Sequence, residues 1–251
     1  MGTRATLGAA LTLAAQFCIL SAAAADAPSA PAGAADPRTY LADITAALDV
    51  PWPRNRAITV VCHGHSVPAG YFKTPVVDTF NAYPHLLHAA LKARHPYAVI
   101  NVIVTAIGGE NAVSGATRFD RDVLPLKPDV LLIDYALNDR GPGLEAARQA
   151  WAEMLAKAQA RGIKVLLLTP TPDQSAKLAD PNDPLSRHAE QIRRLAAEHG
   201  VGLVDSLAAF QAYVAGGGTL ADVMSQVNHP NRKGHDLVLG ELLKWFPAAA
   251  R

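Results

Sequence analysis

Apolar residues in this chain form short continuous runs that alternate with longer stretches of mixed apolar and polar positions. The runs have the composition of strands that are buried on both faces of a sheet. The longer stretches have the spacing of amphipathic helices. The predicted strands are 57–62, 98–106, 129–135, 163–169 and 201–204. The predicted helices are 38–48, 78–94, 117–124, 143–161, 184–199, 206–215 and 230–246. This alternation predicts an α/β domain in which helices cover both faces of a parallel sheet.

The amino-terminal segment follows a different pattern. Arg4 gives a positive start, residues 7–20 are apolar, and Ala23, Ala24 and Ala25 provide the small residues of a cleavage site. We interpret residues 1–25 as a secretory signal peptide, which predicts a secreted or periplasmic protein. The apolar stretch is short for a membrane span, so no stable membrane anchor is expected. Residues 26–36 are rich in Ala, Pro and Ser and predict a flexible leader before one domain over 37–251.

Composition narrows the class of partner. The 251 residues include 23 basic and 22 acidic side chains, and half of all residues are apolar, which is enough for one large core. No basic run is present, so a nucleic-acid partner is not expected. Loss of the signal peptide would also remove Cys18 and leave Cys62 alone, without a partner for an intrachain disulfide. We interpret Cys62 as a buried thiol at a strand end, with a cysteine nucleophile as the alternative.

Three polar blocks stand beside predicted strands or helices. Gly64–Ser66 follows the first strand, Asn138–Asp139 follows the third, and His229–Asn231 precedes the last helix. Ligands of parallel sheets gather at the carboxyl ends of strands. A serine hydroxyl needs a base to act as a nucleophile, and an asparagine amide can donate to a developing oxyanion. Taken singly, each block also fits a helix cap or a turn.

Two further features bear on the chemistry. Gly108 and Gly109 follow the second strand, where glycine lets the backbone approach a substrate. Their spacing does not fit a dinucleotide-binding fingerprint. Pro230 predicts the first position of the last helix. The positive end of that helix would then help to keep His229 neutral and able to act as a base.

Together these blocks resemble the SGNH (GDSL-type) hydrolase superfamily over essentially the whole predicted domain. The resemblance implies a three-layer α/β/α sandwich with a flavodoxin-like parallel sheet of about five strands. It also implies ester hydrolysis through an acyl-enzyme, without a cofactor or a metal. Ser66 matches the nucleophile and His229 the base. Ser66, Gly109 and Asn138 match the oxyanion hole, with Gly108 as the alternative to Gly109.

The sequence departs from the family pattern at three positions. His65 stands where an aspartate usually precedes the serine, and Ala136 stands where a glycine precedes the asparagine block. Gln226 stands three residues before His229, where the family has the acid that orients the histidine. In serine proteases, replacing that acid by its amide costs about 10⁴-fold in turnover. We therefore predict Asp222, the nearest acid upstream of His229, as a substitute, with Asp205 as the second candidate.

The resemblance includes carbohydrate acetylesterases, so the predicted function is that of a secreted serine O-acetylesterase acting on a glycan or another small-molecule ester. A lipase or arylesterase of the same superfamily is one alternative. A degenerate domain that binds glycans without hydrolysing them is another. A metal site is a third alternative, suggested by His63, His65, His229 and His235. No carboxylate–histidine motif accompanies these histidines, which disfavours the metal site.

Overall fold

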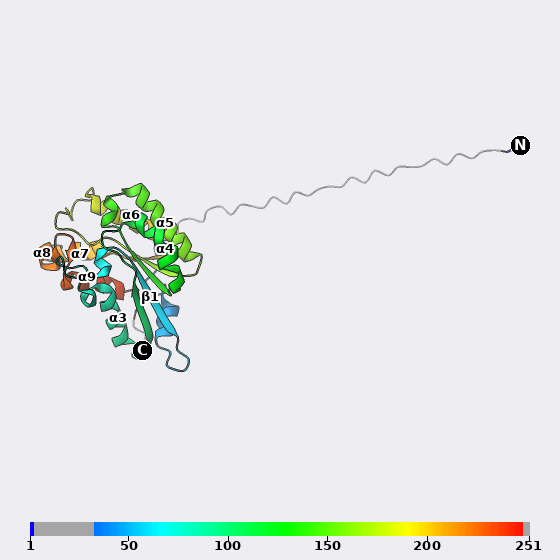
Figure 1. Ribbon diagram of the computed structural model, residues 1–251, viewed down its shortest axis with the longest axis horizontal. Helices are drawn as coiled ribbons and strands as arrows, with labels where there is room; N and C mark the ends of the chain where they lie inside the picture. Colours follow the sequence, from blue (N-terminus) through cyan, green and yellow to red (C-terminus); the bar gives the residue numbers. More distant parts are fainter. Residues whose placement is uncertain (3–32, 248–251) are drawn as a thin grey trace. The chain divides into compact units, whose positions relative to one another are not determined.

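The computed structural model describes residues 1–2 and 33–247, and its centre is a sheet of five parallel strands (Figure 1). The strands are β1 (Ala57–Gly64), β2 (Val99–Val104), β3 (Val130–Asp134), β4 (Lys164–Leu168) and β5 (Gly202–Val204). Their order is β2-β1-β3-β4-β5, which is the flavodoxin-like order. The predicted fold class is confirmed, and each predicted strand matches an observed one to within two residues at either end.

The longer helices also follow the predicted alternation. They are α1 (Ala42–Leu48), α3 (Tyr83–Arg94), α4 (Ala112–Asp122), α5 (Leu144–Gln159), α6 (Pro184–His199), α7 (Ser206–Ala215) and α9 (Arg232–Leu243). Shorter elements are α2 (Ser66–Ala69), α8 (Leu220–Val223) and the two-stranded antiparallel ribbon of β6 (Met224–Gln226) and β7 (His229–Pro230). Most of these shorter elements lie close to the predicted site residues in the sequence.

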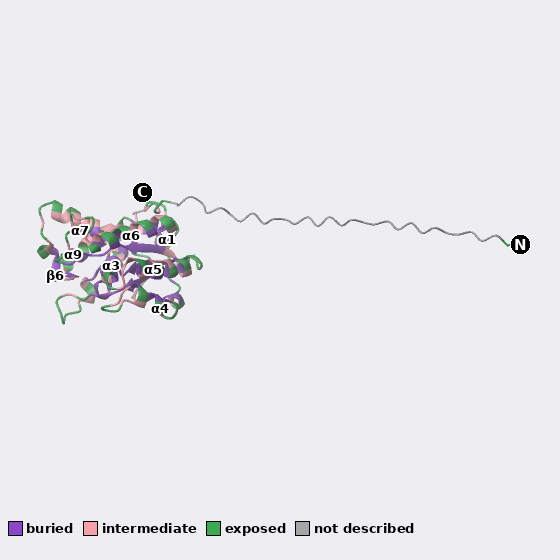
Figure 2. Cartoon of the chain, turned by 90° about the horizontal axis from the view of Figure 1, so that it is seen from above, coloured by how far each residue is buried: buried purple, intermediate pink, exposed green. Residues whose placement is uncertain are grey.

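Successive residues of each strand point to opposite faces of the sheet, so a continuously apolar strand contributes to two cores. In β1, Ile58 and Val60 belong to one core and Val61 belongs to the other. Helices α1, α3, α7 and α9 close the first core, α4 and α5 close the second, and α6 contributes to both. Figure 2 shows the buried residues concentrated on the sheet and on the inner sides of these helices.

Helix α4 begins five residues before the predicted 117–124. Its cap is Asn111, whose side-chain oxygen accepts a hydrogen bond of 3.1 Å from the backbone N–H of Ser114. Gly115 in the following turn weakens the helical pattern in the sequence. That glycine is required by packing, because a Cβ there would lie within 2.4 Å of the Tyr135 ring. The tertiary contact therefore outweighs local propensity.

The predicted signal peptide and most of the predicted leader fall on residues 3–32, outside the described part of the chain. The end of the predicted leader does contact the domain, because the backbone N–H of Ala35 donates to the Val201 carbonyl at 3.2 Å. Among the helices of the described residues, none is long and apolar enough to cross a bilayer.

Candidate active site

The sheet has its topological switch point between β1 and β3, because the chain leaves β1 toward one edge of the sheet and leaves β3 toward the other. Crevices form at this point beyond the carboxyl ends of the strands. Ser66 follows β1, and Asn138 follows β3. The glycine loop after β2 is joined to the same region by a hydrogen bond of 3.0 Å from the Ile107 N–H to the Gly64 carbonyl.

Ser66 is the first residue of the short helix α2 and is 6% exposed. The preceding Gly64 allows the turn, because a Cβ at that position would lie 2.5 Å from the Asp134 carbonyl oxygen. His65 caps the helix: its Nδ1 accepts a hydrogen bond of 3.2 Å from the Val67 N–H. The Oγ of Ser66 lies 3.0 Å from Nε2 of His229. The serine and histidine blocks therefore meet across 163 residues of sequence.

His229 is held by the β6–β7 ribbon, where it pairs with Gln226. The expectation that the last helix begins at Pro230 is wrong. Pro230 lies in β7, and α9 begins after Asn231, whose side-chain oxygen caps the N–H of Gly234 at 3.1 Å. Asparagine is a preferred cap, and it moves the helix end away from His229.

The environment of His229 favours the neutral ring by a different route from the predicted helix dipole. Burial lowers the pKa of His229 from its ordinary 6.5, the carbonyl of Phe72 raises it, and the neighbouring His65 lowers it. The pKa stays below 6.5, so His229 is uncharged at pH 7 and able to accept a proton.

Two groups lie next to Nδ1 of His229: the Phe72 carbonyl oxygen at 2.9 Å and Nε2 of Gln226 at 2.7 Å. The amide orientation is fixed because Oε1 of Gln226 accepts from the Thr74 N–H at 3.0 Å. An amide N–H2 cannot accept a hydrogen bond, so only the Phe72 carbonyl can accept from an Nδ1–H. In that tautomer Nε2 is free to accept the proton of Ser66.

Two of the predicted oxyanion donors, Gly109 and Asn138, lie in loops that are hydrogen-bonded to one another. Gly109 has φ of 82°, in the left-handed region that favours glycine. Nδ2 of Asn138 donates to the Glu110 carbonyl at 2.8 Å, which uses one of its two hydrogens and ties it to the glycine loop. Within the described residues, the backbone N–H groups of Ser66 and Gly109 have no hydrogen-bond acceptor. These groups are free to donate to an oxyanion.

Asp139 has a structural role beside Asn138. Its carboxylate accepts hydrogen bonds of 2.7 Å from the Ala112 N–H and from Nε1 of Trp151. Burial raises the pKa of Asp139 to about 6, although these two donors oppose the shift. The contact with Ala112 fixes the start of α4, and with it the glycine loop, against the Asn138 block.

The model of the GDSL-like lipase/acylhydrolase family matches residues 62–237, a segment that contains all of these groups. The chain belongs to this family. The match also confirms the resemblance drawn from the sequence blocks, and it makes the protein a GDSL-family ester hydrolase. A search of curated proteins finds no match.

Solved structures of other proteins share the fold. An acetylxylan esterase from Geobacillus stearothermophilus has a TM-score of 0.65 at 19% identity, over 75% of this chain and 94% of that one. A two-domain esterase active on acetylated mannans has a TM-score of 0.66 at 19% identity, over 82% of this chain and 52% of that one. A GDSL-like lipase described as putative, from Parabacteroides merdae, has a TM-score of 0.65 at 15% identity, over 75% of this chain and 95% of that one.

This GDSL hydrolase does not place either predicted acid beside His229. Asp222 is exposed and completes the capping box of α8, where it accepts from the Thr219 N–H at 2.8 Å. Asp205 caps α7 and forms an ion pair of 2.8 Å with Arg193. The prediction that Asp222 orients His229 is therefore wrong, because its carboxylate is engaged by its own helix terminus.

The other two histidines considered for a metal site, His63 and His235, are engaged by the protein. His63 contacts Oγ1 of Thr105 at 2.9 Å and the Gly115 carbonyl at 3.2 Å. Nδ1 of His235 accepts from the Tyr83 N–H at 3.2 Å. Across residues 33–247, the structure contains no group of three or more His, Cys, Asp or Glu side chains that could hold a metal ion.

Cys62 is fully buried in β1, as predicted. Burial, together with the charge of Asp134, raises the pKa of its thiol far above the ordinary value. The thiol therefore stays protonated, and this argues against a cysteine nucleophile.

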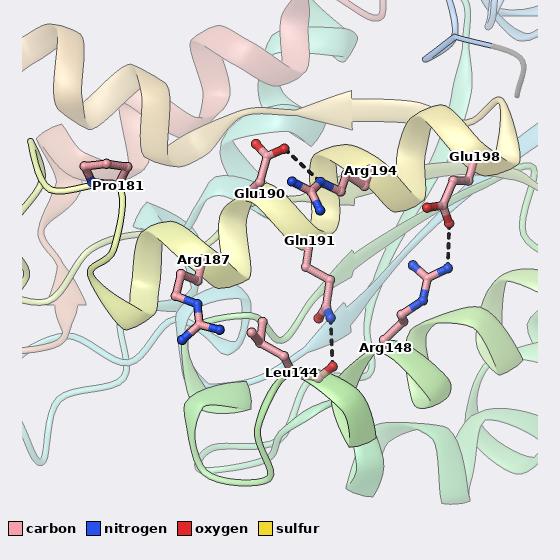
Figure 3. A pocket seen from close by; sticks show the side chains of 8 residues that line it. All are labelled: Leu144, Arg148, Pro181, Arg187, Glu190, Gln191, Arg194 and Glu198. Atoms are coloured by element: carbon pink, nitrogen blue, oxygen red, sulfur yellow. Dashed lines mark hydrogen bonds and ion pairs between the residues drawn. The ribbon is translucent and has the colours of Figure 1, made fainter.

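A cavity of about 480 Å³ lies between α5 and α6, but it is separate from the candidate active site of this hydrolase (Figure 3). Its lining contains none of the predicted site residues. Arg148 pairs with Glu198 at 2.8 Å, and Arg194 pairs with Glu190 at 3.0 Å. These exposed pairs satisfy much of the charge that lines the cavity.

Proposed function

We propose that this GDSL-family protein is an exported serine esterase that removes O-acetyl groups from carbohydrates. The observation that carries the proposal is the 3.0 Å contact between Oγ of Ser66 and Nε2 of His229. A hydroxyl within reach of a neutral imidazole is the arrangement that acyl transfer requires. The acetylxylan and acetylmannan esterases with the same fold support an acetylated glycan as substrate. The amino-terminal sequence pattern supports export.

In the proposed reaction, Nε2 of His229 accepts the Ser66 proton as Oγ forms a bond to the acyl carbon. The N–H groups of Ser66 and Gly109 and the amide of Asn138 donate to the oxyanion, each worth about 3 kcal/mol of barrier. The His229 imidazolium then gives its proton to the departing sugar oxygen. Water attacks the acyl-enzyme with His229 again as base, and acetate leaves.

Tyr71 supports a short acyl group. Its ring centroid lies 5.8 Å from that of His229. A Cβ on Gly108 would lie only 3.0 Å from the same tyrosine ring. The ring therefore stands close to both the base and the glycine loop and restricts the space between them. A long acyl chain would need that space, whereas an acetyl group would not.

The test is Ser66→Ala with an acetylated xylo-oligosaccharide and with p-nitrophenyl acetate. Acetate release should fall by at least about 10³-fold, while the circular dichroism spectrum stays unchanged. Ser186→Ala, on α6 and not among the predicted site residues, is the matched control and should keep full activity.

Unchanged turnover in the Ser66→Ala variant would contradict the serine mechanism. A preference of the wild type for long acyl esters would favour the lipase or arylesterase alternative. Binding of acetylated glycans without any turnover by the wild type would favour the non-catalytic alternative.

A further inference from the structure

A buried polar cluster beside Ser66 takes no part in the proposed reaction. His65 is fully buried and Asp134 is 1% exposed, and Nε2 of His65 lies 3.4 Å from Oδ1 of Asp134. The second carboxylate oxygen of Asp134 accepts from the Tyr83 hydroxyl at 3.1 Å. The three side chains come from the end of β1, the end of β3 and the start of α3. Burial of this kind is costly unless the groups compensate one another.

The contacts of His65 define its tautomer. Nδ1 accepts from the Val67 N–H at 3.2 Å, so Nδ1 carries no hydrogen and the ring N–H is on Nε2. Nε2 is also the ring atom that lies next to Oδ1 of Asp134. The separation of 3.4 Å is within ion-pair range, but the two atoms do not form an aligned hydrogen bond. The attraction between the carboxylate and the ring is therefore electrostatic. It holds the ring at Nε2, the nitrogen that does not lie next to Ser66.

His65 also reaches the nucleophile. Its Nδ1 lies 3.5 Å from Oγ of Ser66, so that hydroxyl has two imidazole acceptors within 3.5 Å. The Val67 N–H occupies Nδ1 of His65, which leaves the hydroxyl hydrogen to His229. The main chain reinforces this arrangement, because the N–H of His65 donates to the Asp134 carbonyl at 3.2 Å.

We propose that His65 is a positioning residue for Ser66, and that Asp134 and Tyr83 act through it. The inference rests on the proposed function, in which Ser66 is the nucleophile. The imidazole caps the turn that carries Ser66 and limits the rotation of its hydroxyl. The Tyr83 hydroxyl holds Asp134, and Asp134 holds the imidazole. A carboxylate at the end of β3 therefore fixes the orientation of the serine that follows β1.

The test is a double-mutant cycle on His65 and Asp134. His65→Ala should lower kcat for p-nitrophenyl acetate by about 10²-fold and leave KM nearly unchanged. A loss of this size is expected when the nucleophile is displaced from its reactive position. Asp134→Asn should lower kcat about tenfold alone and cause no further loss in the His65→Ala background. His65→Asn, which can still cap Val67, should recover part of the lost kcat. The rate at which an organophosphonate labels Ser66 should follow kcat in every variant.

Two variants guard against a general loss of structure. His63→Gln removes a buried histidine of β1, two residues before His65, and should reduce stability to urea while leaving kcat unchanged. Tyr83→Phe removes only the hydroxyl that holds Asp134. It should lower kcat about threefold, and this effect should vanish in the His65→Ala background.

The outcomes separate this inference from the proposed function. Hydrolysis by Ser66→Ala at the wild-type rate would overturn both. An inactive Ser66→Ala variant, combined with additive effects of His65→Ala and Asp134→Asn, would overturn the positioning role alone. A loss of kcat in His63→Gln as large as that in His65→Ala would do the same.

Discussion

Nδ1 of His229 has two neighbours that favour opposite tautomers. The Phe72 carbonyl requires a hydrogen on Nδ1, and this tautomer can accept the Ser66 proton. The amide N–H2 of Gln226 favours a bare Nδ1, and the hydrogen would then sit on Nε2 and oppose proton transfer. A main-chain carbonyl thus takes the place of the usual acid, in competition with Gln226.

Gln226→Glu should remove this competition. One carboxylate oxygen can keep the Thr74 N–H, and the other can accept Nδ1–H of His229. We expect kcat/KM for p-nitrophenyl acetate to rise about tenfold near pH 8, in line with a charge-assisted hydrogen bond. The acid limb of the pH–rate profile lies below pH 6.5 in the wild type, because the pKa of His229 is lowered. A nearby carboxylate should move that limb to higher pH.

Gln226→Met is the matched control, because it removes the amide without adding a charge. It should give a smaller gain and leave the acid limb in place. A Gln226→Glu variant with reduced kcat/KM and an unshifted acid limb would contradict the tautomer argument.

Residue type explains which site groups could be predicted. Ser66, Asn138 and His229 stand out as chemically capable side chains beside strand ends, and the structure brings Ser66 and His229 into contact. The Phe72 carbonyl gave no such signal, because every residue carries a main-chain carbonyl. Proximity in sequence points to Asp222, and this prediction is wrong. Thr219 three residues earlier formed a readable capping-box pattern that pointed to its true partner.

At the scale of elements, Asn231 links α8, β6 and α9 next to His229. Its side-chain oxygen caps α9, its amide donates to the Asp222 and Met224 carbonyls, and its N–H donates to the Val223 carbonyl. Asn231→Ala should therefore lower the free energy of unfolding by about 1–2 kcal/mol, measured in urea. It should also lower kcat, because the β6–β7 ribbon holds His229. Asn231→Asp keeps the capping oxygen and should lose less. Equal losses in the two variants would contradict the capping role.

Length and periodicity explain which elements were predicted. The five strands are continuously apolar and the longer helices are periodic, so both can be recognised from sequence alone. The β6–β7 ribbon is too short to be independently stable and depends on tertiary contacts. Pro230 predicts a helix start in the sequence, yet proline is also tolerated in strands at the edge of a sheet, where it lies here.

At the scale of the whole domain, three histidines outside the proposed reaction are buried in the neutral form. Burial, assisted by neighbouring cationic groups, lowers the pKa of His63 to about 4, that of His188 to about 4 and that of His235 to about 3. In the unfolded chain each should titrate near 6.5. Between these values the unfolded chain binds more protons than the folded domain.

The domain should therefore lose stability as the pH falls from 6.5 toward 4. Asp139 opposes this trend, because its raised pKa makes the folded state bind a proton between about 3.8 and 6. Three histidines against one carboxyl leave a net uptake of about two protons on unfolding near pH 5, or roughly 3 kcal/mol per pH unit.

Urea unfolding at pH 7, 6 and 5 measures this slope. His188→Gln should reduce the slope by about one proton, because the glutamine cannot titrate. The pH dependence of the unfolding free energy is set by the difference in bound protons, and therefore by these shifted pKa values. A free energy of unfolding that does not change with pH in the wild type would contradict the burial of these histidines in the neutral form. A pH dependence that is the same in His188→Gln as in the wild type would contradict it for His188.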